Sequence, residues 1–288
     1  MLTVLITTDF SQAAHNASLY GVELASKLGA NIVLMNVYTV PLSVPESYVI
    51  VNPDEVKKSA EMYLMEAALK LRKSDLQPID IVAVEGPTSE MIIKQSLQYE
   101  NCLIVAGMKG SGTNVRKVFG SSATGLARKS QCPLIIVPEK STFTSIEKIA
   151  LATSKDYYAD FSAVDLLKSV GERFDAKVFI VMVLSNDYNV VDEMVLRSNR
   201  LINKLKPLEV TYNFPRSDDI TTALIDFSQN KNIDLMALIP QHHPFIERLF
   251  VKSETRDMIF HSQIPLLLLP ETTQQSNKNK VKLQHQHS

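Results

Sequence analysis

Short apolar runs alternate with segments of helical periodicity along the first half of the chain. The apolar runs are LTVLITT at 2–8, NIVLMNVY at 31–38, IDIVAVEG at 79–86, LIVA at 103–106 and PLIIVP at 133–138. Between them, apolar residues recur at helical spacing within 13–24, 54–71, 89–99 and 123–129. Runs of this length bounded by turn residues predict buried strands. Strands that alternate with helices predict an α/β fold with a mainly parallel five-stranded sheet, right-handed crossovers and helices on both faces.

The second half of the chain repeats the first. SQCPLIIVP at 130–138 matches SQIPLLLLP at 262–270, and VLITTDFS at 4–11 lies over IALATSKD at 149–156. A repeat at this spacing indicates two tandem copies of one unit. We therefore expect domains at 1–140 and 146–271, joined by a short polar linker at 139–147. The polar residues 272–288 are expected to be a disordered tail, because they lack apolar side chains to offset the entropy of ordering.

Each copy ends in a strongly apolar strand, PLIIVP in the first and PLLLLP in the second. A strand of this kind at the edge of a sheet has to be covered. We expect the two final strands to meet within one chain and to form a pseudo-symmetric pair. Whether two chains associate further into a homodimer is not readable from the sequence.

A glycine motif follows the fourth predicted strand. Gly107 and Gly110 are followed by nine residues and then by Gly120, Ser121 and Ser122. Glycine lets a main chain turn its N–H groups toward a polyphosphate and approach its oxygens closely. The two serines add hydroxyl donors, and a helix that starts at Ala123 would direct free amides at an anion. The alternative is that these are turn glycines in a surface loop.

Composition narrows the classes of function. The formal net charge is −1, so no broad nucleic-acid or membrane-binding surface is expected. No charged leader precedes the first predicted strand, and no apolar run reaches the roughly 18 residues of a membrane span. The two cysteines, Cys102 and Cys132, are expected to be free thiols rather than a disulfide framework. These features predict a cytoplasmic protein.

Taken together, the motifs resemble the universal stress protein domain of the ATP-binding type. The resemblance rests on TDFS after the first strand, NVY after the second, G-x2-G-x9-G-S and CPLIIVP, over roughly the first 140 residues. It implies a domain of flavodoxin-like, adenine-nucleotide-alpha-hydrolase-like appearance that is usually dimeric and acts in stress survival. Its ligand would be ATP, with or without Mg²⁺. Cys102 departs from the family, which more often has an acidic residue there.

The resemblance also implies a role for each matching residue. Asp9 and the backbone of Val37 would hold the adenosine end of the nucleotide. The phosphates would be held by Gly107, Gly110, Gly120 and Ser121, with Ser122 beside them.

The second copy lacks most of these residues. By the same offsets, Asp9 becomes Ser154, and Gly107, Gly110, Gly120 and Ser121 become Ile239, His242, Lys252 and Ser253. Ile239 brings a branched side chain, and Pro240 removes an amide donor. We therefore expect one nucleotide site per chain, in the first copy. A basic cluster in the second copy could hold another anion, although a solvated loop explains it as well: His242, His243, Arg248, Lys252 and Arg256.

No catalytic set emerges from the sequence. The glycine motif lacks the GK[ST] ending of a P-loop, and neither a nucleophile elbow nor a dinucleotide fingerprint is present. His15 is expected to be a surface or capping residue, and no metal ligands are assigned, because His285 and His287 lie in the polar tail. The favoured interpretation is a regulatory ATP-binding module that an unknown protein partner reads. The alternatives are a weak ATPase or autophosphorylating enzyme and a scaffold that binds no nucleotide.

Overall fold

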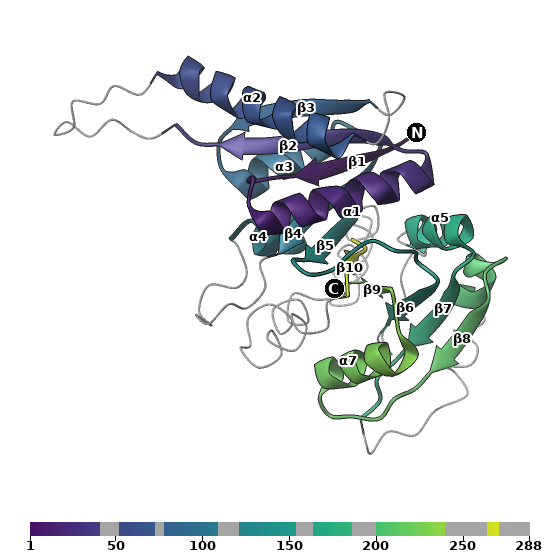
Figure 1. Ribbon diagram of the computed structural model, residues 1–288. Helices are drawn as coiled ribbons and strands as arrows, with labels where there is room; N and C mark the ends of the chain where they lie inside the picture. Colours follow the sequence, from purple (N-terminus) through teal and green to yellow (C-terminus); the bar gives the residue numbers. More distant parts are fainter. Residues whose placement is uncertain are drawn as a thin grey trace, which may run out of the picture.

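Ten strands form one continuous sheet in the computed structural model, which describes residues 1–40, 52–72, 78–108, 121–153, 164–185, 200–239 and 264–270. The strand order is β3-β2-β1-β4-β5-β10-β9-β6-β7-β8 (Figure 1). In the first half the elements are β1 (Leu2–Thr7), α1 (Gln12–Leu28), β2 (Asn31–Tyr38), α2 (Pro53–Leu71), β3 (Ile79–Glu85), α3 (Thr88–Ser96), β4 (Asn101–Met108), α4 (Ser121–Lys129) and β5 (Leu134–Pro138). In the second half they are β6 (Lys148–Ala152), α5 (Asp165–Phe174), β7 (Lys177–Val181), β8 (Val210–Asn213), α7 (Ile220–Lys231), β9 (Leu235–Leu238) and β10 (Leu266–Leu268).

The two halves have the same strand order, which confirms the tandem α/β fold expected from the sequence. Five strands of each half pair in parallel, with the first strand of the half at the centre and the fourth strand beside it. Val4 pairs with Leu103 in the first half, and Ile149 pairs with Leu235 at the matching position of the second half. The register therefore reproduces the offsets read from the sequence.

The final strands of the two halves join the sheet. β5 and β10 pair antiparallel, with Ile135 opposite Leu267 at the centre of the pairing. Both side chains are almost fully buried, with 1% and 0% of their surface exposed. The prediction that the two final strands meet within one chain is confirmed, and it explains why both are apolar throughout.

Helices cover both faces of the sheet. The apolar sides of α1, α2 and α5 pack into one buried cluster, represented by Leu24, Leu64 and Leu167. On the opposite face, α3, α4 and α7 pack into a second cluster, represented by Ile92 and Leu126. A strand that is apolar along its whole length needs cover on both of its faces. The sheet therefore separates two apolar cores.

Local capping explains where the first two helices begin. Ser11 is the N-cap of α1, since its side chain accepts a hydrogen bond from the N–H of Ala14. Gly29 ends that helix in the left-handed conformation, with φ 63°. Asn52 caps α2 through the N–H of Asp54, and Pro53 occupies the first turn. Capping residues therefore define the starts of both helices and the end of α1.

Two predicted boundaries were wrong by a few residues. α3 ends at Ser96 rather than at Tyr99, because the N–H groups of Gln98 and Tyr99 bond three residues back and tighten the chain into a turn. β4 continues to Met108 rather than ending at Ala106, so the first glycine of the glycine motif belongs to the strand.

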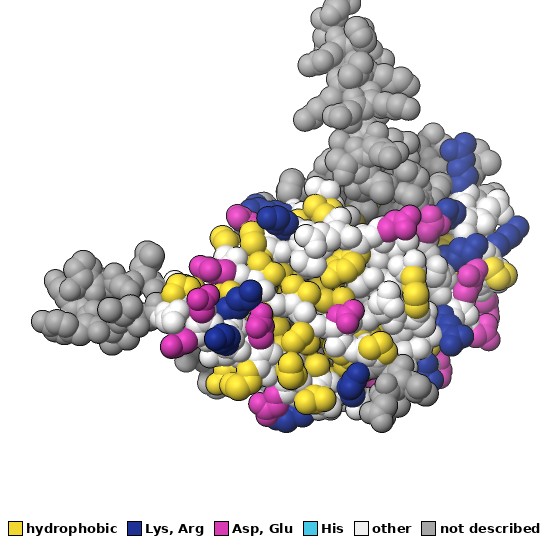
Figure 2. Space-filling view, turned by 90° about the horizontal axis from the view of Figure 1, so that it is seen from above, with side chains coloured by type: hydrophobic (Ala, Val, Ile, Leu, Met, Phe, Trp, Pro, Cys, Tyr) yellow, Lys and Arg dark blue, Asp and Glu magenta, His cyan; other side chains and the backbone are white. Residues whose placement is uncertain are grey.

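α2 is amphipathic, as expected, but its outer side is partly apolar. Leu64 and Ala68 are buried against the sheet, whereas Met62, Met65 and Leu69 are exposed. The face seen from above, which carries α2, shows hydrophobic side chains scattered among charged ones (Figure 2). The exposed charges of α2 include the ion pair between Glu66 and Lys70.

The segment between the halves is not the polar linker that the sequence predicted. Ile146 is buried, and the ring of Phe143 lies between Tyr20 of α1 and Phe174 of α5, with centroid distances of 5.1 and 6.0 Å. Asn16 of α1 fixes the start of the segment by donating hydrogen bonds to the carbonyl oxygens of Pro138 and Ser141. The segment thus packs against both halves.

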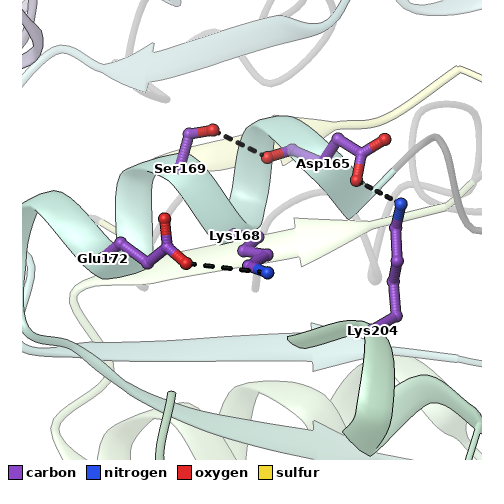
Figure 3. Close-up of polar contacts among 5 residues, drawn as sticks. All are labelled: Asp165, Lys168, Ser169, Glu172 and Lys204. Atoms are coloured by element: carbon purple, nitrogen blue, oxygen red, sulfur yellow. Dashed lines mark hydrogen bonds and ion pairs between the residues drawn. The ribbon is translucent and has the colours of Figure 1, made fainter. Parts of the chain in front are cut away.

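Surface charges connect α5 to the helical residues 200–205. Lys204 pairs with Asp165 at 2.5 Å, and Lys168 pairs with Glu172 at 3.6 Å along α5 (Figure 3). The hydroxyl of Ser169 donates to the carbonyl of Asp165. Exposed pairs of this kind contribute roughly 0–1 kcal/mol each, so the packing of α5 depends on its buried side.

Across the described ranges, none of the helices combines the length and the apolar character needed to cross a membrane. The basic cluster of the second half and the tail at 272–288 lie outside the residues that the structure describes.

Candidate functional site

The order of the strands reverses its direction next to β1. From β1 the chain continues outward through β2 and β3, whereas β4 and β5 lie on the other side of β1. In open α/β sheets, ligands bind at the carboxyl ends of the strands at such a switch point. Asp9 follows β1, Val37 lies near the end of β2 and Gly107 lies near the end of β4. The fold therefore brings these three sequence-predicted residues to one edge of the sheet.

Local hydrogen bonds order the loop after β1. The carboxylate oxygen Oδ1 of Asp9 accepts from the N–H of Ser11 at 3.0 Å, and the hydroxyl of Thr8 accepts from the N–H of Phe10 at 3.0 Å. Phe10 adopts φ 61°, a left-handed conformation that is uncommon for a residue of this size. Asp9 thus stands exposed in an Asx turn. Ser11 is the helix cap, and Asp9 supports the turn before it.

Asn36 is a part of this site that the sequence reasoning missed. Its side chain is 7% exposed, and Nδ2 donates a 2.8 Å hydrogen bond to the carbonyl oxygen of Thr8. This bond ties the end of β2 to the loop that carries Asp9. The signal in the sequence was Asn36 itself, an amide side chain in the interior of the apolar run NIVLMNVY. At the corresponding position of the second half the residue is Met182, which cannot donate such a bond.

Gly107 is required by packing rather than by an unusual backbone angle. It lies in β4 opposite Val137, and its φ is not in the left-handed region. A Cβ atom there would lie 2.5 Å from the carbonyl oxygen of Ala13 and 3.0 Å from the Cα of Ala14. The glycine therefore lets the first turn of α1 lie directly against β4. This corrects the expectation that Gly107 belongs to a wrapping loop.

The phosphate end of the predicted site is described only in part. Gly110 and Gly120 lie outside the described residues, and Ser121 and Ser122 are described by their backbone alone, as the first residues of α4. α4 packs closely on α3 at Gly125. A Cβ atom at this position would lie 2.8 Å from the hydroxyl of Ser89 in α3. The amino end of α4 is the part of the predicted phosphate site that the structure positions.

The second half differs at the position of Gly107. The register places Ile239 there, one residue beyond β9, as Gly107 follows Ala106 in β4. Ile239 is 6% exposed and belongs to the apolar cluster shared by α1, α2 and α5. A buried branched side chain thus replaces the glycine. The other counterparts, Ser154, His242, Lys252 and Ser253, lie outside the described residues.

A cavity of about 280 Å³ adjoins the loop after β1. Its walls come from that loop and from two helices, with Phe10 and His15 on one side and Tyr63 and Lys70 on the other. The rings of Phe10 and Tyr63 meet at 5.7 Å. The hydrogen bond from Lys70 lowers the pKa of Glu66, which also lines the cavity. His15, which was expected to be a surface or capping residue, is exposed and contributes to this wall.

Among the described residues, no three His, Cys, Asp or Glu side chains cluster closely enough to hold a metal ion. What the arrangement offers is an exposed carboxylate, an ordered loop and a helix amino end at one edge of the sheet. These are features suited to binding a polar or anionic ligand.

Comparison with known proteins agrees with this architecture. A solved universal stress protein from Archaeoglobus fulgidus superposes with a TM-score of 0.69 at 18% identity, covering 93% of this chain and 98% of the other. A functionally unknown protein from Pseudomonas aeruginosa gives a TM-score of 0.56 at 10% identity, with 94% and 92% covered. At these identities the likeness establishes the fold.

Sequence comparisons relate the first half of the chain to one family. Two relatives from Mycobacterium tuberculosis strains, universal stress proteins MT2699 and Rv2624c, are each 29% identical over 141 residues. The matched part is 49% of this chain, and the chain spans about half the length of these relatives. The family model described as the universal stress protein family matches residues 1–138. Residues 1–138 are therefore similar to the universal stress protein family.

Proposed function

We propose that the first half of the chain binds one adenine nucleotide, ATP, and acts as a regulatory module. The observation that carries the proposal is the convergence of Asp9, Val37 and Gly107 at the strand-order reversal beside β1. The exposed Asp9 carboxylate suits the hydroxyl groups of a ribose. The backbone of Val37 would contact the adenosine end, and the amino end of α4, with Gly120 and Ser121, would face the phosphates.

The second half is proposed to serve as a built-in pairing partner without a nucleotide site of its own. Support comes from Ile239, whose buried side chain occupies the position of Gly107. Further support comes from Met182, which replaces the amide that orders the loop after β1. The antiparallel pairing of β5 with β10 joins the two halves within one chain, which supports this pairing role.

Titration calorimetry of the full chain with Mg-ATP tests the proposal. We expect one molecule of ATP per chain. A stoichiometry near two would refute the single site, and no heat together with no protection against unfolding would refute nucleotide binding altogether. Thin-layer chromatography of radiolabelled ATP after incubation separates binding from hydrolysis, since a binding module returns the nucleotide unchanged.

Matched variants of the two copies assign the site. Asp9→Asn keeps the oxygen that accepts from the N–H of Ser11 but removes the charge, so we expect ATP affinity to fall about tenfold or more while the fold is retained. Ser121→Ala is expected to weaken binding, and Ser253→Ala, its counterpart in the second copy, is not. Equal effects of the two serine variants would contradict the assignment.

A further inference from the structure

Cys102 lies at the amino end of β4, and Cys132 lies in the bend just before the neighbouring parallel strand β5. β4 and β5 pair with Ile104 opposite Leu134, and the ladder continues backward through the hydrogen bond from the N–H of Ile104 to the carbonyl of Pro133. Cys102 and Cys132 each lie two residues before this pair, so they are neighbours at the same end of the two strands. The residues are thirty positions apart in the sequence, so only the sheet brings them together.

The geometry of the sheet suits a bond between the two sulfur atoms. Neighbouring strands lie about 4.8 Å apart, and disulfides join residues with Cα atoms about 4.4–6.8 Å apart. Both side chains belong to the apolar cluster on the face covered by α3 and α4. The interaction between the two thiols shifts the pKa of each of them. They therefore face each other, although both are free.

The two thiols differ in exposure and in acidity. Cys102 is 6% exposed, whereas Cys132 is half-buried. The hydrogen bond from Cys102 lowers the pKa of Cys132 to about 6, and the same contact together with burial raises the pKa of Cys102. Ser130 holds the backbone of Cys132 in place by accepting from its N–H and donating to its carbonyl oxygen. A half-buried thiol with a lowered pKa thus lies beside a buried thiol with a raised pKa.

We propose that Cys102 and Cys132 form an oxidisable pair that hydroperoxides convert into an intramolecular disulfide. In the first step the sulfur of Cys132 attacks a peroxide oxygen; the S–O bond forms, the O–O bond breaks, and the departing oxygen takes up a proton. In the second step Cys102 loses its proton and attacks the sulfur of the resulting sulfenic acid. The S–S bond forms as the S–O bond breaks, and hydroxide leaves with the thiol proton as water. Two electrons pass from the two sulfurs to the peroxide.

The pair lies at the opposite edge of the sheet from the proposed nucleotide site. Cys102 follows the first residue of β4, whereas Gly107 lies near the end of that strand. The proposal therefore stands independently of ATP binding, and it can be tested on the protein without nucleotide.

The test is to treat the full chain with hydrogen peroxide and to measure its intact mass and its reactive thiols after unfolding. We expect a loss of about 2 Da, no thiol left for N-ethylmaleimide, and full recovery with dithiothreitol. Two thiols that stay reactive, disulfides that form only between chains, or irreversible gain of oxygen would each overturn the proposal.

Single substitutions distinguish the thiol that attacks the peroxide from the thiol that closes the disulfide. Cys102→Ser is expected to stop at a sulfenic acid on Cys132 that dimedone traps, whereas Cys132→Ser leaves only the buried thiol and should react at least about tenfold more slowly. The alkylation rate of Cys132 by iodoacetamide should be half-maximal near pH 6. Circular dichroism confirms that both variants fold. Equal peroxide rates for the two folded variants would contradict the assignment of Cys132 as the attacking thiol.

Discussion

Single side chains distinguish the two copies at the carboxyl edge of the sheet. At Gly107 the absence of a side chain lets the backbone of α1 come within contact distance of β4. At Ile239 the same sheet position is filled by a buried branched side chain. Glycine and isoleucine are exchanged without altering the strand order, because the ladder of β9 and β10 involves the backbone alone. The difference between the copies therefore lies in side chains, on a shared main-chain framework.

The first prediction concerns Gly107. We expect Gly107→Ala to lower the free energy of unfolding by about 1–3 kcal/mol, because the new Cβ meets rigid backbone atoms of Ala13. Gly29→Ala is the matched control: φ is 63° there, and no atom lies within 4 Å of the new Cβ. Its cost should be about 1 kcal/mol, from conformation alone. Urea denaturation of both variants measures the difference, and a smaller loss at Gly107 than at Gly29 would contradict the packing argument.

The second prediction concerns Tyr20 in alkaline solution. Burial, and next the carboxylate of Asp234, raise the pKa of Tyr20 above its ordinary value near 10. The folded protein then holds the phenol proton at pH values where the unfolded chain has lost it. The contribution of Tyr20 to the free energy of unfolding is fully present below about pH 10. Above that pH it falls by about 1.4 kcal/mol per pH unit.

Tyr20→Phe isolates that contribution, because it keeps the ring against Phe143 and removes the ionisable group. Urea titrations of both proteins at several pH values from 8 to above 10 should show a shallower decline for the variant. Parallel declines would contradict the assignment.

At the scale of elements, tertiary hydrogen bonds fix where strands begin and how loops lie. Asn36 joins the end of β2 to the loop after β1, and Asn16 joins α1 to the segment after β5. Asp234 plays the same role in the second half, where its Oδ2 accepts from the N–H groups of Glu147 and Lys148 at 2.9 Å each. One side chain thus aligns the start of β6 with the turn before β9.

The third prediction concerns this contact. Asp234→Ala leaves two N–H groups without their acceptor and should cost about 1–3 kcal/mol of stability. Asp234→Asn retains a side-chain oxygen in the same place and should cost clearly less. Thermal melts of the two variants compare them, and equal losses would show that the charge, rather than the hydrogen bonds, is what matters.

At the scale of the whole molecule, the two halves share one sheet and one apolar cluster. The residues of α1 and α5 belong to the same buried cluster, and the guanidinium of Arg173 donates a hydrogen bond to the carbonyl oxygen of Lys27. Phe143 lies between the two helices. Packing of this kind predicts that the halves unfold together rather than one after the other.

The fourth prediction follows from that packing. Calorimetry of the full chain should show one unfolding transition whose calorimetric and van't Hoff enthalpies agree. Phe143→Ala should lower stability by about 3 kcal/mol or somewhat less, because the ring is only partly buried. Two separate transitions in the unsubstituted protein would contradict the coupling of the halves.

The sequence by itself determined the strands, the helices and their repetition, because apolar periodicity and capping residues such as Ser11 and Asn52 act locally. It also located the candidate edge of the sheet through Asp9 and Gly107, and it predicted that the two final strands pair. Which residue touches which is a long-range property, so tertiary structure alone decided it. The packing role of Gly107, the bond from Asn36 to Thr8, the place of Phe143 between the halves and the meeting of Cys102 with Cys132 all depend on strand register and helix packing, which no local pattern encodes.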